Sequence, residues 1–343
     1  MIDDKARTET NEANDTSKIV SVNRQNSSWR AYIKYVEPLL YIIGVLWVVA
    51  TLTFGLMQLT NDDVVDQVFS QQQSLSVEAQ AEKRTALGLT APIWVQYGRW
   101  LGGVIQGDLG QSLVTGEPVS ALLWSKLPAS LLLMGSAVGL TLLIALPLGL
   151  WTAHNAGTVG DRLVRGITLF GNTMPNFFTA LLLLYVVALK LNWLPVIARH
   201  NDPTALILPT VTLVWSMSAK YIQQIRALAL DELSKPYIRG LRTRGLSWYV
   251  IYSRYILRAI AGPIVALVAL SCGSLLGGVT IVETIFMWDG VGKMAFDAIT
   301  ARDYPVLQAY VLWLAALYIL FNGGADFLQR KLNHREREEA GHE

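Results

Sequence analysis

Cysteine, histidine and charged residues are all scarce in this chain of 343 residues. The single cysteine, Cys272, excludes an internal disulfide, and the four scattered histidines lack the close spacing of a metal-ligand set. Charged residues make up 16% of the sequence, below the roughly 25% that is usual in soluble domains. The net charge of +2 is too small to indicate the basic surface of a nucleic-acid-binding protein. We therefore expect no protein-built metal site and no nucleic-acid partner.

Long apolar runs are abundant instead. Apolar residues make up 52% of the sequence, and the mean hydropathy is +0.36. A bilayer core of about 30 Å needs roughly 20 apolar residues per helix, and six runs meet this length. Only Lys220, in the fourth run, interrupts any of them with a charge. The sequence predicts an all-α integral membrane protein with six transmembrane helices. The runs are residues 39–59, 127–153, 167–189, 204–225, 259–282 and 306–325.

The two ends of the chain differ from this membrane domain, which we place at residues 39–328. Residues 1–38 are rich in Asn, Ser, Thr and Glu and are predicted to be a disordered polar tail, whose purpose the sequence does not reveal. They contain no apolar core of a cleavable signal peptide, so the first run is expected to act as an uncleaved signal. Residues 329–343 form a second, charged tail.

The distribution of Lys and Arg predicts the orientation. The N-terminal tail carries six, the loop after the fourth run carries seven, and the C-terminus carries four. The long first loop holds four against seven acidic residues. By the positive-inside rule, both termini are cytoplasmic and the first, third and fifth loops face outward. We expect a multi-pass protein of the plasma, or inner, membrane with an N-in, C-in topology.

No catalytic or ATP-binding set is visible. The segment Gly290-Val-Gly292-Lys293 resembles part of a phosphate-binding loop, but Met287 replaces its first Gly and Met294 its Ser/Thr. The apolar runs hold no Ser/His, paired-Asp or metal-ligand set, which argues against a membrane-embedded enzyme. Glu283, at the end of the fifth run, is nearly the only acidic residue in the predicted spans. An ion-coupled secondary transporter needs paired carboxylates or a proton relay within its spans, so the sequence argues against that class. We expect a non-catalytic chain that binds no cofactor.

The large first loop contains an amphipathic segment at residues 91–101. Helical spacing places Trp94, Tyr97 and Leu101 on one face, a pattern suited to a helix at the membrane interface. Either it forms an external platform near the pore mouth, or it is a lid packed on the spans for stability. Prolines at 147, 175, 209 and 263 mark points where the spans break, flex or pack.

The fourth loop predicts a short helix that a cytoplasmic partner can bind. Ser234 is suited to an N-cap, Pro236 to the first turn, and Gly245 to a left-handed C-terminal residue. The helix would be about ten residues long. Its apolar face would be an exposed knob ringed with arginine, able to sit in a groove of a soluble protein. The alternative is a solvated loop that docks nothing. The face comprises Tyr237, Ile238 and Leu241, with Arg239 and Arg242 pointing elsewhere.

This loop resembles the cytoplasmic coupling loop of ATP-binding-cassette (ABC) importer permeases, and further motifs resemble the oligopeptide, dipeptide and nickel branch of that family. The resemblance covers about residues 39–332 in order, with the permease core at 129–328. The motifs are Leu87-Gly-Leu, Gly107-Asp-Leu-Gly-Gln-Ser112, Leu127-Pro-Ala-Ser130, Met174-Pro-Asn-Phe-Phe178, Trp193-Leu-Pro195, Ile207-Leu-Pro209, Val282-Glu-Thr-Ile-Phe286, Gly290-Val-Gly292 and Arg302-Asp-Tyr-Pro-Val306.

The resemblance implies partners. They are a second permease, either a paralogue or a second copy of this chain, two ABC ATPase subunits that bind ATP and Mg, and an extracytoplasmic solute-binding protein. The loop-four helix would be the coupling helix seated on an ATPase, whose closure would switch the pore between inward- and outward-facing states. The residues expected to couple are Tyr237, Ile238, Leu241, Arg242 and Gly245.

The resemblance also implies a translocation path at Met174, Asn176 and Glu283. An ionisable group at a span end is a functional candidate, but Glu283 could equally pair with a neighbouring backbone or with Arg302. Turns at the external ends of the last two spans would dock the binding protein. This docking set is Trp288, Asp289 and Asp303, and Asp289 stands where the family generally has Pro.

For the substrate, the short third loop and the motifs around Met174 and Glu283 look closest to nickel and metallophore permeases. Nickel or a metal chelate is therefore expected, with a dipeptide or oligopeptide as the alternative. The lack of His and Cys ligands in the spans favours a chelated or hydrated ion over transfer between protein ligands.

Overall fold

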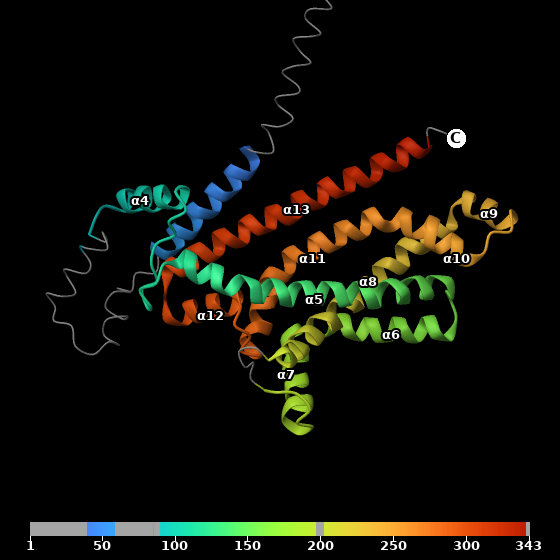
Figure 1. The fold of residues 1–343 in the computed structure, drawn as a ribbon, viewed down its shortest axis with the longest axis horizontal. Coiled ribbons are helices and arrows are strands. Elements are labelled where there is room, and N and C mark those ends of the chain that lie inside the picture. The colour runs from blue at the N-terminus through green and yellow to red at the C-terminus, as the bar shows by residue number, and fades with distance from the viewer. Residues whose placement is uncertain (1–39, 59–84, 86–89, 197–201, 341–343) are drawn as a thin grey trace, which may run out of the picture. The chain divides into compact units, whose positions relative to one another are not determined.

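The computed structural model describes residues 40–58, 85, 90–196 and 202–340 (Figure 1). Within these ranges the chain is helical and has no strand apart from an isolated bridge between Gln111 and Pro118. The chain forms two units, Met1–Thr53 and Phe54–Glu343. The predicted N-terminal tail lies outside the described residues. The core lies in the second unit. The expected all-α fold is confirmed for the described part.

Five described helices are long and apolar enough to cross a membrane. A sixth crossing exists only if a bent pair, Val159–Thr173 and Asn176–Lys190, counts as one span. The interruption expected at Pro175 within the span over 167–189 is present, and the two parts meet there at 100°. The five helices cover Leu40–Gln58, Val119–His154, Pro203–Ser234, Trp248–Leu275 and Tyr304–Gln329.

A proline explains the bend between α6 (Val159–Thr173) and α7 (Asn176–Leu183). Pro175 disfavours the helical conformation of the residue before it, and Met174 is extended, with φ −79° and ψ 126°. The other predicted breaks are not realised in this way. Pro147 and Pro263 lie inside the continuous helices α5 and α11, and Pro209 lies in the first turn of α8.

The remaining helices follow the predicted runs but extend beyond them. The last helix continues unbroken to Ala340, so the charged tail from residue 329 begins inside it. The elements are α4 (Ile93–Ile105), α5 (Val119–His154), the π-helix η1 (Leu184–Lys190), the 3-10 turn η2 (Pro203–Leu206), α8 (Ile207–Ser234), α9 (Pro236–Thr243), α10 (Trp248–Val250), the π-helix η3 (Ile251–Ile256), α11 (Leu257–Ile285), α12 (Val291–Ala301) and α13 (Tyr304–Ala340).

The core is centred on α8, which packs along α5 and also contacts α6, α7 and α11. Gly149 of α5 allows the closest approach, since a Cβ there would lie 2.7 Å from Cγ2 of Ile225. On the other side of α8, Tyr221 is fully buried and its hydroxyl donates to the Leu267 carbonyl of α11 at 3.2 Å. α8 thus connects the first half of the unit to the second.

The predicted amphipathic helix of the first loop exists as α4. The rings of Tyr97 and Trp100 pack on Phe54, with centroids 5.3 and 5.6 Å away. Trp94, expected on the same face as Tyr97, is instead 76% exposed. Packing on Phe54 therefore involves only part of the expected face.

We predict that Gly149→Val destabilises the helix pair α5 and α8. The added side chain would collide with Ile225 and with the Ile222 carbonyl, 3.2 Å from the Cβ position. Overpacking of this kind typically costs about 1–3 kcal/mol. Thermal unfolding in mild detergent measures the effect. Gly139→Val on the same helix is the control, because nothing lies within 4 Å of its Cβ position; equal losses from both variants would contradict the packing assignment.

Candidate functional site

The functional candidates of the sequence occupy separate places in the structure. Met174 and Asn176 flank the bend between α6 and α7, and Glu283 lies in the last turn of α11. Trp288 and Asp289 follow in the turn before α12, and the predicted coupling residues lie on and after α9. The turn before α12 and the helix α9 lie at opposite ends of α11 (Figure 1).

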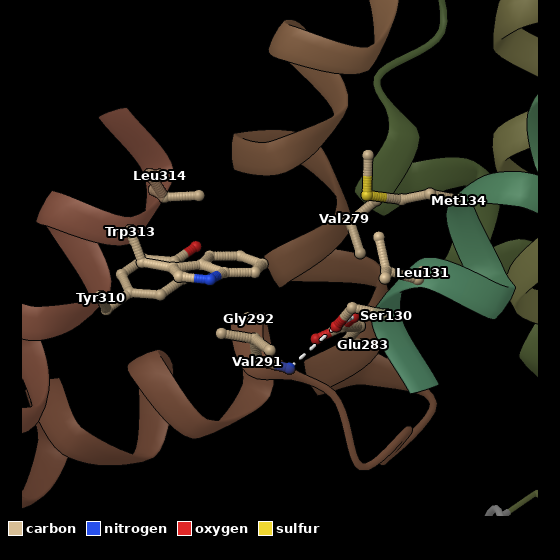
Figure 2. A pocket seen from close by; sticks show the side chains of 10 residues that line it. All are labelled: Ser130, Leu131, Met134, Val279, Glu283, Val291, Gly292, Tyr310, Trp313 and Leu314. Atoms are coloured by element: carbon tan, nitrogen blue, oxygen red, sulfur yellow. Dashed lines mark hydrogen bonds between the residues drawn. The ribbon is translucent and has the colours of Figure 1, made fainter. Parts of the chain in front are cut away.

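Glu283 is completely buried and hydrogen-bonded. Its Oε1 accepts the Ser130 hydroxyl at 2.6 Å, and its Oε2 accepts the backbone N–H of Lys293 at 2.9 Å. The N–H of Gly292 also donates to this carboxylate. Figure 2 shows Glu283 directly beside Ser130 and the start of α12. The carboxylate thus occupies the N-terminus of a helix, where free N–H groups and the helix dipole stabilise negative charge.

Two glycines make this close approach possible. A Cβ at Gly290 would lie 2.2 Å from Oε1 of Glu283, and a Cβ at Gly292 would lie 2.9 Å from Oε2. Any other residue at Gly290 would displace the carboxylate. This explains why Gly290-Val-Gly292 looks like a phosphate-binding loop: the segment does surround an anion at a helix N-terminus, but the anion is the chain's own Glu283.

Ser130 joins three segments at this point. Its hydroxyl donates to Glu283 and accepts the N–H of Val291 at 2.8 Å. Next to it, the indole N–H of Trp288 donates to the Ala129 carbonyl at 3.0 Å. These bonds fasten α5 to α11 and α12. We call the set Ser130, Glu283 and the first turn of α12 the carboxylate clasp.

The contacts of Glu283 match the backbone-pairing interpretation, since its partners are a hydroxyl and backbone N–H groups. The cavity beside it, lined by Met134, Tyr310 and Trp313 among others, has a free volume of about 10 Å³, which is no more than one water molecule needs. In this conformation Glu283 is a buried structural anchor, and its place on the translocation path stays a prediction.

The turns on either side of α12 contain one exposed and one buried acid. The Asp289 side chain is 54% exposed and forms an ion pair with Lys126 at 2.6 Å. Asp303 is only 4% exposed and accepts the Ser112 hydroxyl and, at 3.1 Å, the N–H of Leu113. Asp303 thereby anchors the 107–118 segment to the start of α13, and its role in docking stays a prediction. Trp288 is partly buried, so Asp289 is the docking candidate that remains on the surface.

These contacts pair motifs that are far apart in the sequence. The motif ending at Ser112 meets the one at Asp303, and the motif ending at Ser130 meets those at Glu283 and Gly290. Sequence reasoning found each motif but missed their pairing. The only sequence signal for these contacts is that two motifs end in a serine, Ser112 and Ser130, and two later motifs contain an acid, Glu283 and Asp303. This signal does not specify which serine bonds to which acid.

Met174 and Asn176 are partly buried at the bend. The Asn176 amide points toward α11, since its Nδ2 lies 3.8 Å from the Cβ position of Gly278. The neighbouring Phe177 and Phe178 are 49% and 44% exposed in the isolated chain. The break in the span thus brings a polar amide against a small-residue stretch of α11, which is a geometry that broken membrane helices use around solute paths.

The predicted helix of the fourth loop exists as α9. Pro236 begins it and Gly245 follows it in the left-handed conformation, with φ +80°, as expected. Ser234 is not the N-cap, because its hydroxyl donates to the Asp231 carbonyl at 2.7 Å. Lys235 holds the cap position instead, and its side chain does not cap the helix.

The apolar face of α9 points into the chain's own core, which corrects the expectation of an exposed knob. Ile238 is 2% exposed and belongs to the main hydrophobic core, and Leu241 packs beside it. The accessible surface of α9 is polar and small. It comprises Tyr237, Arg239, Gly240, Arg242 and Thr243.

Two polar contacts also hold α9 in place. The Glu232 carboxylate, 6% exposed at the end of α8, accepts the Tyr237 hydroxyl and forms an ion pair with Lys235 at 2.6 Å. The Arg242 guanidinium lies 4.3 Å from the ring centroid of Trp248, a cation–π distance. A push on α9 is therefore passed directly to α8 and to the segment that begins α11. The sequence analysis did not single out Glu232, because nothing local indicates that this acid is buried.

Metal ligands are not gathered anywhere in the described ranges. No group of three or more His, Cys, Asp or Glu residues is close enough there to hold an ion. A metal that crosses this chain would thus meet no protein-built chelating site in the described part.

Comparison with known proteins gives consistent relatives. Residues 145–338 match the family described as "Binding-protein-dependent transport system inner membrane component". The nickel import system permease protein NikB of Staphylococcus aureus strain bovine RF122 / ET3-1 is 32% identical over 304 residues, covering 88% of this chain and 91% of the relative. The same protein of strain USA300 has the same identity and coverage.

The structural comparison agrees on the fold. A chain of the MetNI methionine ABC transporter, solved in inward-facing conformations, matches with a TM-score of 0.53 and 15% identity. The match covers 62% of this chain and 96% of that chain. At this identity, the likeness supports the helix arrangement alone.

We predict that Glu283→Ala strongly destabilises the carboxylate clasp. The substitution leaves the Ser130 hydroxyl and two N–H groups of α12 without an acceptor, at roughly 1–3 kcal/mol for each buried group left unsatisfied. Glu283→Gln keeps one carbonyl acceptor and should lose less. Thermal unfolding of the purified protein measures the order. Asp289→Asn, which changes an exposed acid in the same region, is the control, and a Glu283→Ala protein as stable as this control would refute the assignment.

Proposed function

The chain belongs to the binding-protein-dependent transport system inner membrane component family, and on this premise we propose that, as a permease subunit of an ABC importer, it passes nickel into the cytoplasm. The nickel would travel as a chelate or a hydrated ion. The observation that supports nickel as the substrate is the 32% identity to nickel import permeases over 88% of the chain. The absence of a ligand cluster in the described part is compatible with it, because a chelated ion needs no protein ligands along its path.

The proposed partners are a second permease, two ABC ATPases and an extracytoplasmic binding protein. The ATPases would bind ATP and Mg and hydrolyse the nucleotide, while this chain binds no cofactor. The proposed location is the plasma membrane, with both termini in the cytoplasm. This orientation places α9 on the ATPase side and the turns around Asp289 on the binding-protein side, which fits the opposite placement of these two regions on α11 (Figure 1).

On the cytoplasmic side, we propose that the accessible edge of α9 contacts the ATPase. Arg239 and Arg242 are exposed on it and suit an acidic groove. Ile238, Leu241 and the Glu232 contacts anchor the helix to the core, while Gly245 lets the chain turn away. ATPase closure would thereby move α8 and α11 together, a rigid-body change of the type used in switching.

On the external side, we propose that the binding protein docks on the surface around Asp289. The Asp289–Lys126 ion pair joins this turn to the start of α5, and the Asp303 contacts hold the 107–118 segment beside α13. Docking there would act on α5, α11 and α12 through the carboxylate clasp. Met174 and Asn176 remain the proposed residues of the translocation path, and Glu283 supports its outer end.

Uptake in cells with and without this chain tests the substrate. Loss of the chain should abolish accumulation of labelled nickel, or of a labelled nickel chelate, and leave uptake of a labelled dipeptide unchanged. The opposite pattern would replace nickel by peptide as the cargo. Solute movement by the purified chain alone, driven by an ion gradient and without ATPase subunits, would contradict an ABC permease altogether.

We predict that Gly240→Glu releases the ATPase subunits. Gly240 is exposed and nothing lies within 4 Å of its Cβ position, so a new side chain leaves the permease fold intact and projects into the contact. A glutamate facing an acidic groove should weaken association by at least about 2 kcal/mol, roughly thirtyfold. Co-purification in mild detergent measures it.

The matched control for this experiment is Gly240→Ala, which adds no charge and should keep the ATPases bound. Leu241→Asp is a poorer test, because Leu241 packs on the core and its loss would unfold the region. If Gly240→Glu retains its ATPases at the same salt-resistance as the natural protein, α9 is not the contact.

A further inference from the structure

A basic pocket lies between α6 and α8, away from every site described above. Three arginines line it, Arg162 and Arg165 from α6 and Arg226 from α8, together with Gly166, Leu169 and Gln223. The pocket is open and has a volume of about 500 Å³. It lies toward the start of α6 and the later part of α8, at the end of the bundle where α9 is found (Figure 1).

One carboxylate stands against these three guanidinium groups, and it is already saturated. Asp161 is 1% exposed, and its two oxygens accept Nε and Nη2 of Arg226 at 2.8 and 2.9 Å. Oδ2 of Asp161 also accepts the N–H of Gly157 at 3.0 Å. Arg162 and Arg165 have no hydrogen-bonded or ion-paired partner in the part of the chain that the structure describes. The pocket therefore has excess positive charge.

The two unpaired arginines are fixed on one side of α6 with room between them and α8. Arg162, Arg165, Gly166 and Leu169 follow the helical spacing of one face. Gly166 adds no side chain, and nothing lies within 4 Å of its Cβ position. The bidentate Asp161–Arg226 pair, with the bond from Gln223 to the Thr168 hydroxyl at 3.1 Å, holds the floor of the pocket rigid.

Apolar side chains surround the same face. Leu163, Leu169 and Phe170 are 63%, 62% and 57% exposed, a surface that in a membrane protein contacts acyl chains. Arginines inside such a surface extend their guanidinium groups to the headgroup level. The pocket thus combines a lipid-facing rim with a cationic centre.

We propose that this pocket binds the phosphate headgroup of an anionic phospholipid in the cytoplasmic leaflet. Guanidinium groups bind phosphate oxygens in pairs of charge-assisted bonds, and basic pockets between spans on the cytoplasmic side suit anionic headgroups. The pocket repels a free metal cation, so it is not a resting place for the proposed cargo. The inference rests on the proposed orientation, because only that orientation places the pocket at the anionic cytoplasmic surface.

Lipid retention by the full chain, purified with its partners and exchanged into nanodiscs of phosphatidylglycerol and phosphatidylethanolamine, tests the proposal. Native mass spectrometry counts the lipids that stay bound. The natural protein should retain phosphatidylglycerol selectively, and the double variant Arg162→Gln with Arg165→Gln should lose that selectivity, roughly fivefold for each arginine removed. The control is Lys220→Gln with Arg254→Gln, which removes two exposed cations outside the pocket and should change nothing.

Three results would overturn the proposal. The first is equal phosphatidylglycerol retention in the arginine variant and the natural protein, and the second is equal loss in the control variant. The third is displacement of the bound phosphatidylglycerol by free inorganic phosphate at millimolar concentration. That result would indicate a site for a soluble anion. Nickel uptake and ATPase association are measured in parallel, so that failure of the lipid proposal with transport intact leaves the proposed function standing.

Accessibility separates lipid from a partner subunit as the occupant. Arg165→Cys in a Cys272→Ser background should react with a lipid-compatible maleimide in the assembled transporter, because the lipid exchanges. A cysteine that reacts in the isolated chain but not in the assembled transporter would show that the second permease covers the pocket, and the lipid assignment would be withdrawn.

Discussion

The packing of α5, α11 and α12 depends on one buried carboxylate at a helix N-terminus. Burying an ionised group is costly unless its oxygens are fully hydrogen-bonded, and Glu283 meets this condition through Ser130 and the first turn of α12. The arrangement demands Gly290, because any Cβ there would occupy the place of the carboxylate. Removing the acid would take away three of the bonds that fix α5, α11 and α12 relative to one another, those from Ser130, Gly292 and Lys293.

The region around α9, at the opposite end of α11, has its apolar residues turned into the core and its polar ones left accessible. Ile238 anchors α9 in the core, Glu232 and Trp248 hold its two ends, and a narrow arginine-bearing edge remains. These contacts attach α9 to the end of α8 and to Trp248 of α10. In the proposed coupling role, this attachment would pass ATPase movement on to the spans.

The sequence predicted the membrane class, the lengths of most spans and the existence of α4 and α9, because apolar length and helical periodicity are local properties. It marked Pro175 as a point where the third span breaks, flexes or packs, but it did not give the 100° angle of that break. It misjudged Ile238, which was expected on an exposed apolar face and lies in the core. The hydrophobicity or charge of a side chain indicates whether it favours burial or solvent. It does not indicate whether other parts of the chain lie close enough to bury it.

What the sequence by itself determined is therefore one-dimensional: which segments enter lipid, where charge collects, and which motifs mark the family. The tertiary structure alone decided the partners of those motifs, 153 positions apart for Ser130 and Glu283 and 191 for Ser112 and Asp303. The physical reason is that a hydroxyl and a carboxylate can satisfy each other in many combinations. Helix packing around α8 brings only certain pairs within hydrogen-bonding distance, and burial then makes those pairs obligatory.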